Sequence, residues 1–447
     1  MANKNNKRLL LYLSIFILIF VSFLFWFLDF NSSTNQFTYS KLKKILSKKN
    51  ISLIKKKATK FIDFNFDLVQ NENFSIKNKK IIFKKYSNNF IKYRYYLEQD
   101  EENIYFITNR GELFYIIKEN LFEDKQIELK KIKTNIDNII GKNYISDANL
   151  VVKEILLINQ KIYVSYLFNN KDCYSNAILE GNLNTNNIVF KSFFKLDECK
   201  KTFNLSKGGN IKKFNNKILL TVGDYEQYEN GVNKDPQNIN SYYGKILSVD
   251  LKSKNIDIIS MGHRNPQGLF YDKQNHIIFS TEHGPQGGDE INVNTNPDTN
   301  EIENYGWAIS SYGEHYGYDN NWSERIKKEP ALIDEKYKFA PLNKSHKNYG
   351  FIEPIKYFTP SIGITEILKV KHSNKDFHKL IVASMGDNKD EDDMTIHILN
   401  FDEKFNMIDH NKIFIGERIR DLIDLGNGHI LMSIEYSGSI GLLKNIY

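Results

Sequence analysis

Short apolar runs separated by polar, turn-forming residues make up most of the chain after about residue 80. The runs are rich in Ile, Val, Tyr and Phe, which favour strands, and Asn, Gly, Asp and Lys fill the gaps. Many short strands at even spacing, with few helical patterns, are typical of a β-sandwich, a barrel or a propeller. No repeat is regular enough to count blades. The predicted strands are Ile81–Phe83, Ile104–Thr108, Leu113–Ile117, Leu150–Ile158, Ile162–Phe168, Ala177–Leu183, Ile188–Phe194, Ile218–Val222, Ile246–Val249, Leu269–Tyr271, Ile277–Ser280, Leu380–Ser384, Thr395–Leu399, Ile430–Ile434 and Ile440–Leu442.

The N-terminus differs from this pattern. Leu9–Leu28 is a run of 20 residues without a charge, about the length that a helix needs to cross a bilayer, and three basic residues precede it. No small-residue cleavage site follows, so we expect an uncleaved anchor rather than a signal peptide. Basic residues on the N-terminal flank place that end in the cytoplasm. This predicts a cytoplasmic segment at 1–8, a transmembrane helix at 9–28, a tether at 29–80 and an outward-facing β domain at 81–447, periplasmic in a Gram-negative cell.

Charge and cysteine content refine this picture. The net charge is +7, but three of the positive charges precede the apolar run, and no basic stripe with interleaved aromatics stands out. We therefore expect no nucleic-acid partner. Cys173 and Cys199 both lie in the part expected outside the cytoplasm, where an oxidising compartment permits a bridge. A disulfide and two unrelated buried thiols both remain open.

Polar clusters crowd the stretch from Met261 to Ser310. His263-Arg264-Asn265 offers a planar cation beside an amide, which suits a carboxylate. Gly284-Pro285 leaves backbone carbonyls able to point outward, and Asp289-Glu290 adds two hard oxygen ligands of the kind that Ca²⁺ prefers. Each cluster by itself equally suits an ordinary polar turn.

Arg418-Ile419-Arg420 is a second constellation. Alternate residues of a strand point to the same face, so both guanidinium groups are expected to project together. Two adjacent cations need an anion between them. A solvated surface pair is the alternative.

These motifs resemble the glucose/sorbosone dehydrogenase family, which includes soluble quinoprotein glucose dehydrogenases and aldose sugar dehydrogenases. The stretches G-H-R-N-P-Q-G-L, T-E-H-G-P-Q-G-G-D-E-I-N and N-Y-G-W occur here in the family's order, and the resemblance extends from about Lys161 to the C-terminus. It implies an all-β fold, a six-bladed β-propeller, here with an N-terminal transmembrane helix. It also implies the cofactor pyrroloquinoline quinone (PQQ), a flat tricarboxylate, and Ca²⁺.

The resemblance also implies residue roles. PQQ would be bound by Arg264, Asn265, Asp289, Arg418 and Arg420. The carbonyls of Gly284 and Pro285 would hold a Ca²⁺ that polarises the quinone as a Lewis acid. A structural Ca²⁺ would use Glu290 and the carbonyl of Tyr305.

Two positions depart from the family pattern. Ser206 stands where the family has the histidine that serves as general base, and no lysine follows Met385-Gly386 at the family's cofactor position. Lys389 is near in sequence but lies in the acidic run Asp387–Asp393, which suits a solvated hairpin or a metal loop. The nearest histidines in sequence are His263, His283 and His315.

Two functions follow. The first is a membrane-anchored, outward-facing dehydrogenase that oxidises a sugar or alcohol by hydride transfer to PQQ. The second is a catalytically impaired propeller that binds a ligand or a protein partner, which the loss of the histidine favours. The substrate and the electron acceptor stay open.

Overall fold

The computed structural model describes residues 65–446 except 78, 89–93, 124–126, 148–150, 171–172, 202–206, 227–232, 286, 299–300, 314–345 and 371–376. Among these residues, no helix combines the length and the apolar character needed to cross a membrane. The predicted transmembrane run Leu9–Leu28 lies outside the described residues, as do Ser206 and His315.

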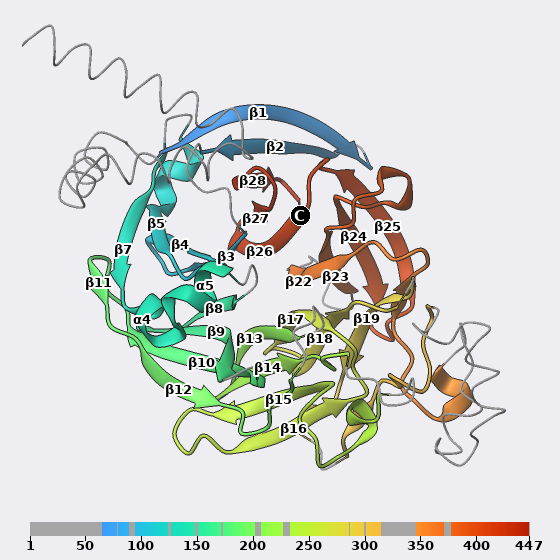
Figure 1. Cartoon of the computed structure of the whole chain (residues 1–447). Helices are drawn as coiled ribbons and strands as arrows, with labels where there is room; N and C mark the ends of the chain where they lie inside the picture. The colour runs from blue at the N-terminus through green and yellow to red at the C-terminus, as the bar shows by residue number, and fades with distance from the viewer. Residues whose placement is uncertain are drawn as a thin grey trace, which may run out of the picture. The chain divides into compact units, whose positions relative to one another are not determined.

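Six β-sheets form a ring around a central axis (Figure 1). Each sheet contributes one inner strand, and neighbouring inner strands contact one another around the whole ring. In ring order the inner strands are β3 (Tyr95–Gln99), β8 (Val152–Ile158), β13 (Gly208–Phe214), β17 (Pro266–Asp272), β22 (Ile364–Val370) and β26 (Ile419–Gly426). The expected all-β, six-bladed propeller is confirmed.

The outer strands complete each blade by mostly antiparallel pairing. Beside β3 lie β4 (Asn103–Thr108), β5 (Leu113–Ile117), β7 (Lys130–Thr134) and β11 (Asn187–Ile188); beside β8 lie β9 (Lys161–Asn170), β10 (Cys173–Asn182) and β12 (Lys191–Lys195). Beside β13 lie β14 (Lys217–Val222), β15 (Lys245–Asp250), β16 (Ile256–Met261) and β20 (Glu303–Asn304); beside β17 lie β18 (Ile277–Glu282), β19 (Asp289–Asn294) and β21 (Lys356–Phe358). Beside β22 lie β23 (Phe377–Ser384), β24 (Thr395–Asp402) and β25 (Met407–Phe414); beside β26 lie β27 (His429–Ile434), β28 (Ser439–Lys444), β2 (Lys79–Ser87), β1 (Asn65–Ile76) and β6 (Ile127–Glu128).

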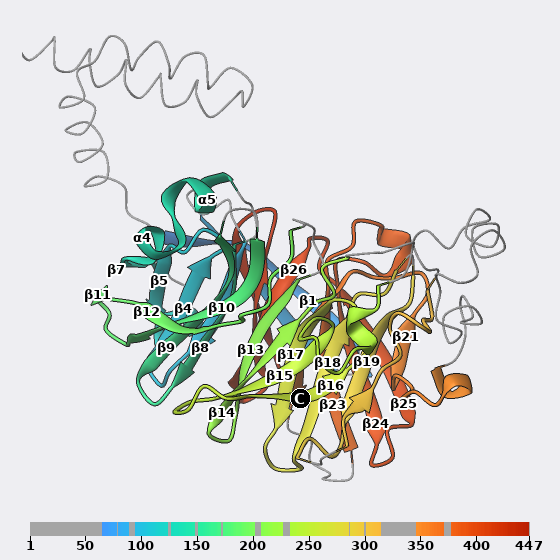
Figure 2. The same cartoon turned by 60° about the horizontal axis from the view of Figure 1, so that its bottom comes forward.

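Helices are few and short in the described part of the chain. The α-helices are α4 (Ile136–Ile140) and α5 (Lys142–Asp147), and the 3₁₀ turns are η1 (Lys118–Phe122), η2 (Asp235–Gln237), η4 (His346–Tyr349) and η5 (Lys389–Glu391). Both views place α4 and α5 at one face of the ring (Figure 2). The acidic run Asp387–Asp393 forms η5 within the β23–β24 connection.

The last blade joins the first described strands of the chain to the last one. β2 pairs antiparallel with β28, with Phe83 opposite Leu443 and Tyr86 opposite Ile440. The propeller therefore already includes β1 and β2, which overlap the segment expected as a tether up to residue 80. Most residues of β1 are exposed or half-buried, so its sequence lacks the apolar run that marks a strand.

The hydrophobic core lies between neighbouring blades. In one cluster, Ile396 of β24 packs with Leu422 of β26 and Phe83 of β2, so the last two blades share one apolar layer. Similar clusters fill the other blade interfaces. The inner strands are thereby fixed on both flanks, which leaves their remaining side chains to line the axis.

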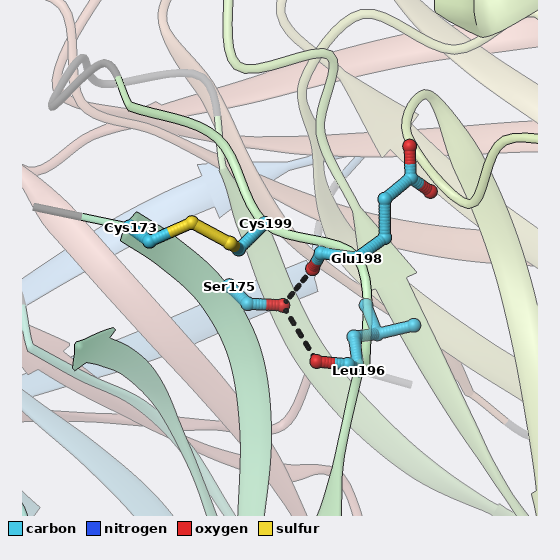
Figure 3. Close-up of a disulfide and its surroundings, with 5 residues drawn as sticks. All are labelled: Cys173, Ser175, Leu196, Glu198 and Cys199. Carbon is cyan, nitrogen blue, oxygen red and sulfur yellow. Dashed lines mark hydrogen bonds between the residues drawn. A yellow bond between two sulfur atoms is a disulfide. The ribbon is translucent and has the colours of Figure 1, made fainter.

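A disulfide joins β10 to the segment that follows β12 (Figure 3). The Cα atoms of Cys173 and Cys199 are 5.4 Å apart, within the usual range for a bridge. Beside it, the hydroxyl of Ser175 donates to the carbonyl oxygens of Glu198 at 2.7 Å and Leu196 at 3.3 Å. The disulfide alternative is thus confirmed.

Candidate functional site

The six inner strands all begin at the same end of the central channel. Residues at the first or second position of each strand line a single cavity of about 20 Å³. These residues are Tyr96, Lys153, Gly208, Gln267, Thr365 and Arg420, and we name this end of the channel the channel mouth. Because loops that precede inner strands gather there, it is the natural place for chemistry on a rigid scaffold.

Three arginines at the channel mouth share one buried carboxylate, that of Glu435. Arg420 donates to its Oε2 through Nη2 at 2.6 Å and Nε at 3.0 Å, and Nε of Arg94 lies 2.6 Å from Oε1. Nε of Arg418 lies 3.6 Å from the same Oε1. Burial alone would raise the pKa of Glu435, but the three guanidinium groups hold it below its usual range. Arg418 and Arg420 therefore do project together, and three cations face this one carboxylate.

Glu435 and Arg94 were not singled out in the sequence. Glu435 directly follows the apolar strand β27, where a carboxylate needs a partner if it is buried. Arg94 precedes β3 among tyrosines. The position of Glu435 directly after an apolar run was the feature of the sequence that could have identified it.

Arg264 braces the loop after β18. Its Nη1 donates to the carbonyl oxygens of His283 at 3.2 Å and Gly284 at 3.3 Å, and its Nη2 lies 3.0 Å from Oε1 of Glu226. The guanidinium carbon lies 5.7 Å from the centre of the Trp307 ring. The Gly284 carbonyl, expected to face outward, thus accepts a hydrogen bond from Arg264.

His263 is fully buried and uses both ring nitrogens. Nδ1 lies 2.8 Å from Oε2 of Glu282, and Nε2 lies 2.8 Å from the hydroxyl of Ser260. The ring also stacks on Tyr305, with centroids 4.9 Å apart. A histidine held in this way positions its neighbours and has no nitrogen left for a substrate.

Asp289 and Asn265 connect blades. Asp289 accepts hydrogen bonds from the backbone N–H groups of Gly284 at 3.1 Å and Ile364 at 2.8 Å, and burial raises its pKa to about 6. Oδ1 of Asn265 accepts from Nε2 of Gln267 at 2.8 Å and from the N–H of Gly208 at 3.3 Å. Both residues therefore hold the backbone around the channel mouth.

The residues expected to hold Ca²⁺ have protein partners. Oε1 of Glu290 lies 3.0 Å from Nε2 of His346, and burial raises the pKa of this carboxyl. The Tyr305 hydroxyl donates to Glu303 at 2.6 Å and to the carbonyl oxygen of Val293 at 2.8 Å. Pro285 is buried in the loop that Arg264 braces. The calcium roles of Gly284, Pro285, Glu290 and Tyr305 stay predictions.

The pKa of His283 is affected by all three arginines that are predicted to bind the cofactor. Its Nε2 lies 2.5 Å from the carbonyl oxygen of Ile364, which fixes the proton on that nitrogen. Burial, and then Arg264, Arg420 and Arg418, lower its pKa to about 3. The imidazole is therefore neutral at pH 7.

Two lysines at the channel mouth were not expected. Lys153, at the second position of β8, lines the cavity, and burial followed by repulsion from Lys207 and Arg420 lowers its pKa to about 7. Burial lowers the pKa of Lys207, just before β13, to about 8. A charged residue inside the apolar stretch V-V-K-E-I was the sequence signal for Lys153.

Comparison with known proteins gives the same assignment for most of the chain. The family model described as Glucose / Sorbosone dehydrogenase matches residues 149–443. An uncharacterized Synechocystis protein, slr1608, is 27% identical over 234 residues, which are 48% of this chain and 49% of that protein. Aldose sugar dehydrogenase YliI of Escherichia coli is 40% identical over 60 residues, 13% of this chain and 15% of that protein. The chain spans about half the length of slr1608 in this match, and less of YliI.

Solved structures share the fold at low identity. The apo form of the soluble aldose sugar dehydrogenase from Escherichia coli superimposes with a TM-score of 0.54 at 17% identity, covering 79% of this chain and 96% of that one. A glucose dehydrogenase gives a TM-score of 0.55 at 17% identity, covering 78% and 96%. These likenesses show the propeller alone, whereas the family match covers well over half of the sequence. The chain belongs to the glucose/sorbosone dehydrogenase family.

Proposed function

We propose that this protein is a membrane-anchored, outward-facing quinoprotein that oxidises a sugar or alcohol hydroxyl, with PQQ as the hydride acceptor. The observation that carries the proposal is the charge imbalance at the channel mouth. Arg94, Arg418 and Arg420 share the carboxylate of Glu435, and Arg418 also pairs with the exposed Asp387, so three cations face two anions and one positive charge is in excess. An anionic ligand with several carboxylates would balance this charge.

The residues present fit such a ligand. Arg94 and Arg418 are the more accessible members of the cluster, with 28% and 17% of their side chains exposed, and Nη1 of Arg418 lies 3.2 Å from the exposed carboxylate of Asp387. Arg264 offers a further guanidinium group, which lies over the Trp307 ring. Charge-assisted pairing with arginine suits planar carboxylates because the donors form a fixed fork. When bound, PQQ would supply the two-electron acceptor.

Calcium is the second implied group. The carbonyl oxygens of Gly284 and Pro285 and the carboxylates of Asp289 and Glu290 are hard oxygens of the kind that Ca²⁺ takes. Burial raises the pKa of both carboxyls, and a divalent cation nearby would favour their ionised forms. The carbonyls of Gly284 and Pro285 would hold the Ca²⁺ that polarises the quinone, and Glu290 with the carbonyl of Tyr305 would hold a structural one.

Lys153 is the proposed proton acceptor. Removal of a hydroxyl proton needs a base, and the family's histidine position is Ser206. His263 has both nitrogens engaged, and the low pKa of His283 makes it a weak base. Lys153 lines the cavity at the channel mouth, and a pKa of about 7 leaves much of it as neutral amine at neutral pH.

The anchor and the outward orientation rest on two observations. The uncharged run Leu9–Leu28 follows three basic residues. The Cys173–Cys199 disulfide suits a compartment in which thiols are oxidised. An outward-facing domain behind a single anchor accounts for both.

Binding of PQQ to the purified protein in the presence of Ca²⁺, followed by absorbance and calorimetry, tests the cofactor. We expect one PQQ per chain. Arg418→Ala should weaken binding at least about tenfold, equivalent to ~1.4 kcal/mol. The control is Lys412→Ala, an exposed cation on β25 paired with Asp392. Equal affinity in the Arg418→Ala and control variants would refute the cofactor site.

Stopped-flow reduction of bound PQQ by sugars tests turnover. Lys153→Met should slow sugar-dependent reduction by roughly 10²–10⁴-fold with little change in PQQ affinity, because a positioned base contributes about that much. Ser206→His should raise the rate. Absence of reduction in the wild type and in Ser206→His, with PQQ still bound, would favour the second candidate, a propeller that only binds its ligand, which the missing histidine supports.

A further inference from the structure

A group of buried carboxylates lies in the central channel and takes no part in the function proposed above. Glu154 of β8, Glu366 of β22 and Asp421 of β26 each place a carboxylate oxygen within 4.8 Å of the other two. All three residues are at least 97% buried, with 1%, 3% and 1% of their surfaces exposed. They come from three different blades, so the fold itself assembles them on the axis.

The spacing matches the coordination sphere of a hard cation. Ca²⁺ holds oxygen ligands at about 2.3–2.6 Å, so two ligands of one ion lie at most ~4.6–5.2 Å apart. Carboxylate oxygens within 4.8 Å of one another meet this condition. Three carboxylates on inner strands also resist the rearrangement that would separate them, because each strand is packed on both flanks.

Asn210 gives an independent indication of a ligand. Its Nδ2 donates to Oε2 of Glu366 at 2.7 Å, to the carbonyl oxygen of Gln267 at 2.9 Å and to Oε2 of Glu154 at 3.2 Å. Its Oδ1 is buried and has no hydrogen-bond partner among the residues that the structure describes, and the residue is only 5% exposed. A buried amide oxygen without a partner needs an explanation, and a bound ion is one.

There is room for one ion beside Asn210. Asn210 lines the cavity of about 20 Å³ together with Glu154 and Glu366. A volume of roughly 10–15 Å³ is enough for one water-sized particle. The cavity is therefore large enough for a single cation.

The charge balance also favours a cation. Lys212 places Nζ 3.6 Å from Oε2 of Glu366, and one ammonium against three carboxylates leaves two negative charges in excess. Lys153 and Arg420 line the same cavity, but Arg420 is paired with Glu435.

We propose that Glu154, Glu366 and Asp421, together with Oδ1 of Asn210, form a Ca²⁺ site on the propeller axis. It differs from the calcium positions that the family resemblance implies, since none of its ligands belongs to the Gly284–Glu290 loop. The bound ion would tie β8, β13, β22 and β26 together.

Metal content and calorimetry of the full chain test the site. The protein is stripped with a chelator, titrated with Ca²⁺ alone and analysed for bound ions after gel filtration. Glu154→Gln/Glu366→Gln should bind one Ca²⁺ fewer than the wild type. The matched control, Asp272→Asn, changes a buried carboxylate paired with Lys369 outside the group and should keep the axial ion. Equal stoichiometry and affinity in the wild type and the double variant would overturn the proposal.

A second variant tests the site without removing a ligand. Lys212→Met takes away the competing ammonium at similar side-chain length, and it should tighten Ca²⁺ binding at least tenfold and increase the rise of Tm on adding Ca²⁺. If the carboxylates are instead held by Lys212 and shared protons, this variant will be destabilised and Ca²⁺ will not rescue it. That result would overturn the proposal even if the double variant failed to fold.

Discussion

Glu435 compensates the positive charge of the arginines at the channel mouth. It is the carboxylate that lets Arg94, Arg418 and Arg420 lie close together in a largely buried setting. Glu435→Gln would leave three guanidinium groups without their common anion, and uncompensated buried charge typically costs about 3–5 kcal/mol. We expect this variant to unfold at lower urea and to recover stability when PQQ or another tricarboxylate is added.

Asp387→Asn is the matched control for Glu435→Gln. Asp387 also pairs with Arg418, but its side chain is 64% exposed, so its loss should change stability little. If both variants unfold at the same urea concentration as the wild type, the cluster does not depend on Glu435.

Lys153 should give the stability a specific dependence on pH. Its ammonium loses its proton near pH 7 in the folded protein and near pH 10.5 when the chain is unfolded. Between these values the unfolded state binds more protons, so the free energy of unfolding rises with pH in this window. Lys153→Met should flatten this rise in urea titrations repeated from pH 7 to 10. Lys213→Met, an exposed lysine on β13, should keep the wild-type slope.

At the level of elements, the disulfide ties the edge of a blade. It closes a loop with a sequence separation of 26 residues, and loop-closure entropy alone predicts roughly 3 kcal/mol of stabilisation. The double variant Cys173→Ser/Cys199→Ser should lose about this much in urea unfolding. Adding a reductant should lower the stability of the wild type toward that of the variant, while the variant itself stays unchanged. A wild type that is insensitive to reduction would show that the bridge contributes nothing.

Four inner strands were missed in the sequence for one physical reason. Inner strands β3, β13, β22 and β26 begin or continue with polar residues because one of their faces lines the channel, as Asn210, Glu366 and Asp421 do. An apolar run is therefore a good sign of a middle strand and a poor sign of an inner one. The sequence did not predict β1 for a different reason: it is an outer strand with few buried residues, so it has no apolar run.

The candidate site was predictable only where motifs are contiguous. Arg264, Asp289 and Arg420 stand in recognisable stretches, and the structure places the first two against Gly284. Glu435, Arg94 and Lys153 stand alone in or beside ordinary strand sequence and meet only through the ring that brings β26, β3 and β8 together. Long-range pairing of this kind leaves only a weak local signal, a charge within or beside an apolar run.

At the scale of the whole molecule, the orientation across a membrane can be tested directly. A single anchor at Leu9–Leu28 with basic residues before it predicts that everything after it is exported. Alkaline phosphatase fused to the C-terminus, which folds only outside the cytoplasm, should be active. The same fusion to a chain lacking residues 1–28 is the control and should be inactive. An expressed but inactive full-length fusion would refute the predicted topology.

The pairing of β2 with β28 has a consequence for how the protein is made. β2 is one of the first strands of the propeller to be synthesised, and its partner β28 is the last. Until β28 has been made, one edge of β2 stays unpaired. Unpaired edges recruit strands from other chains, so copies that are still being synthesised, or that stop before β28, are exposed to aggregation. A chain cut just before β28 should therefore aggregate more readily than the full chain.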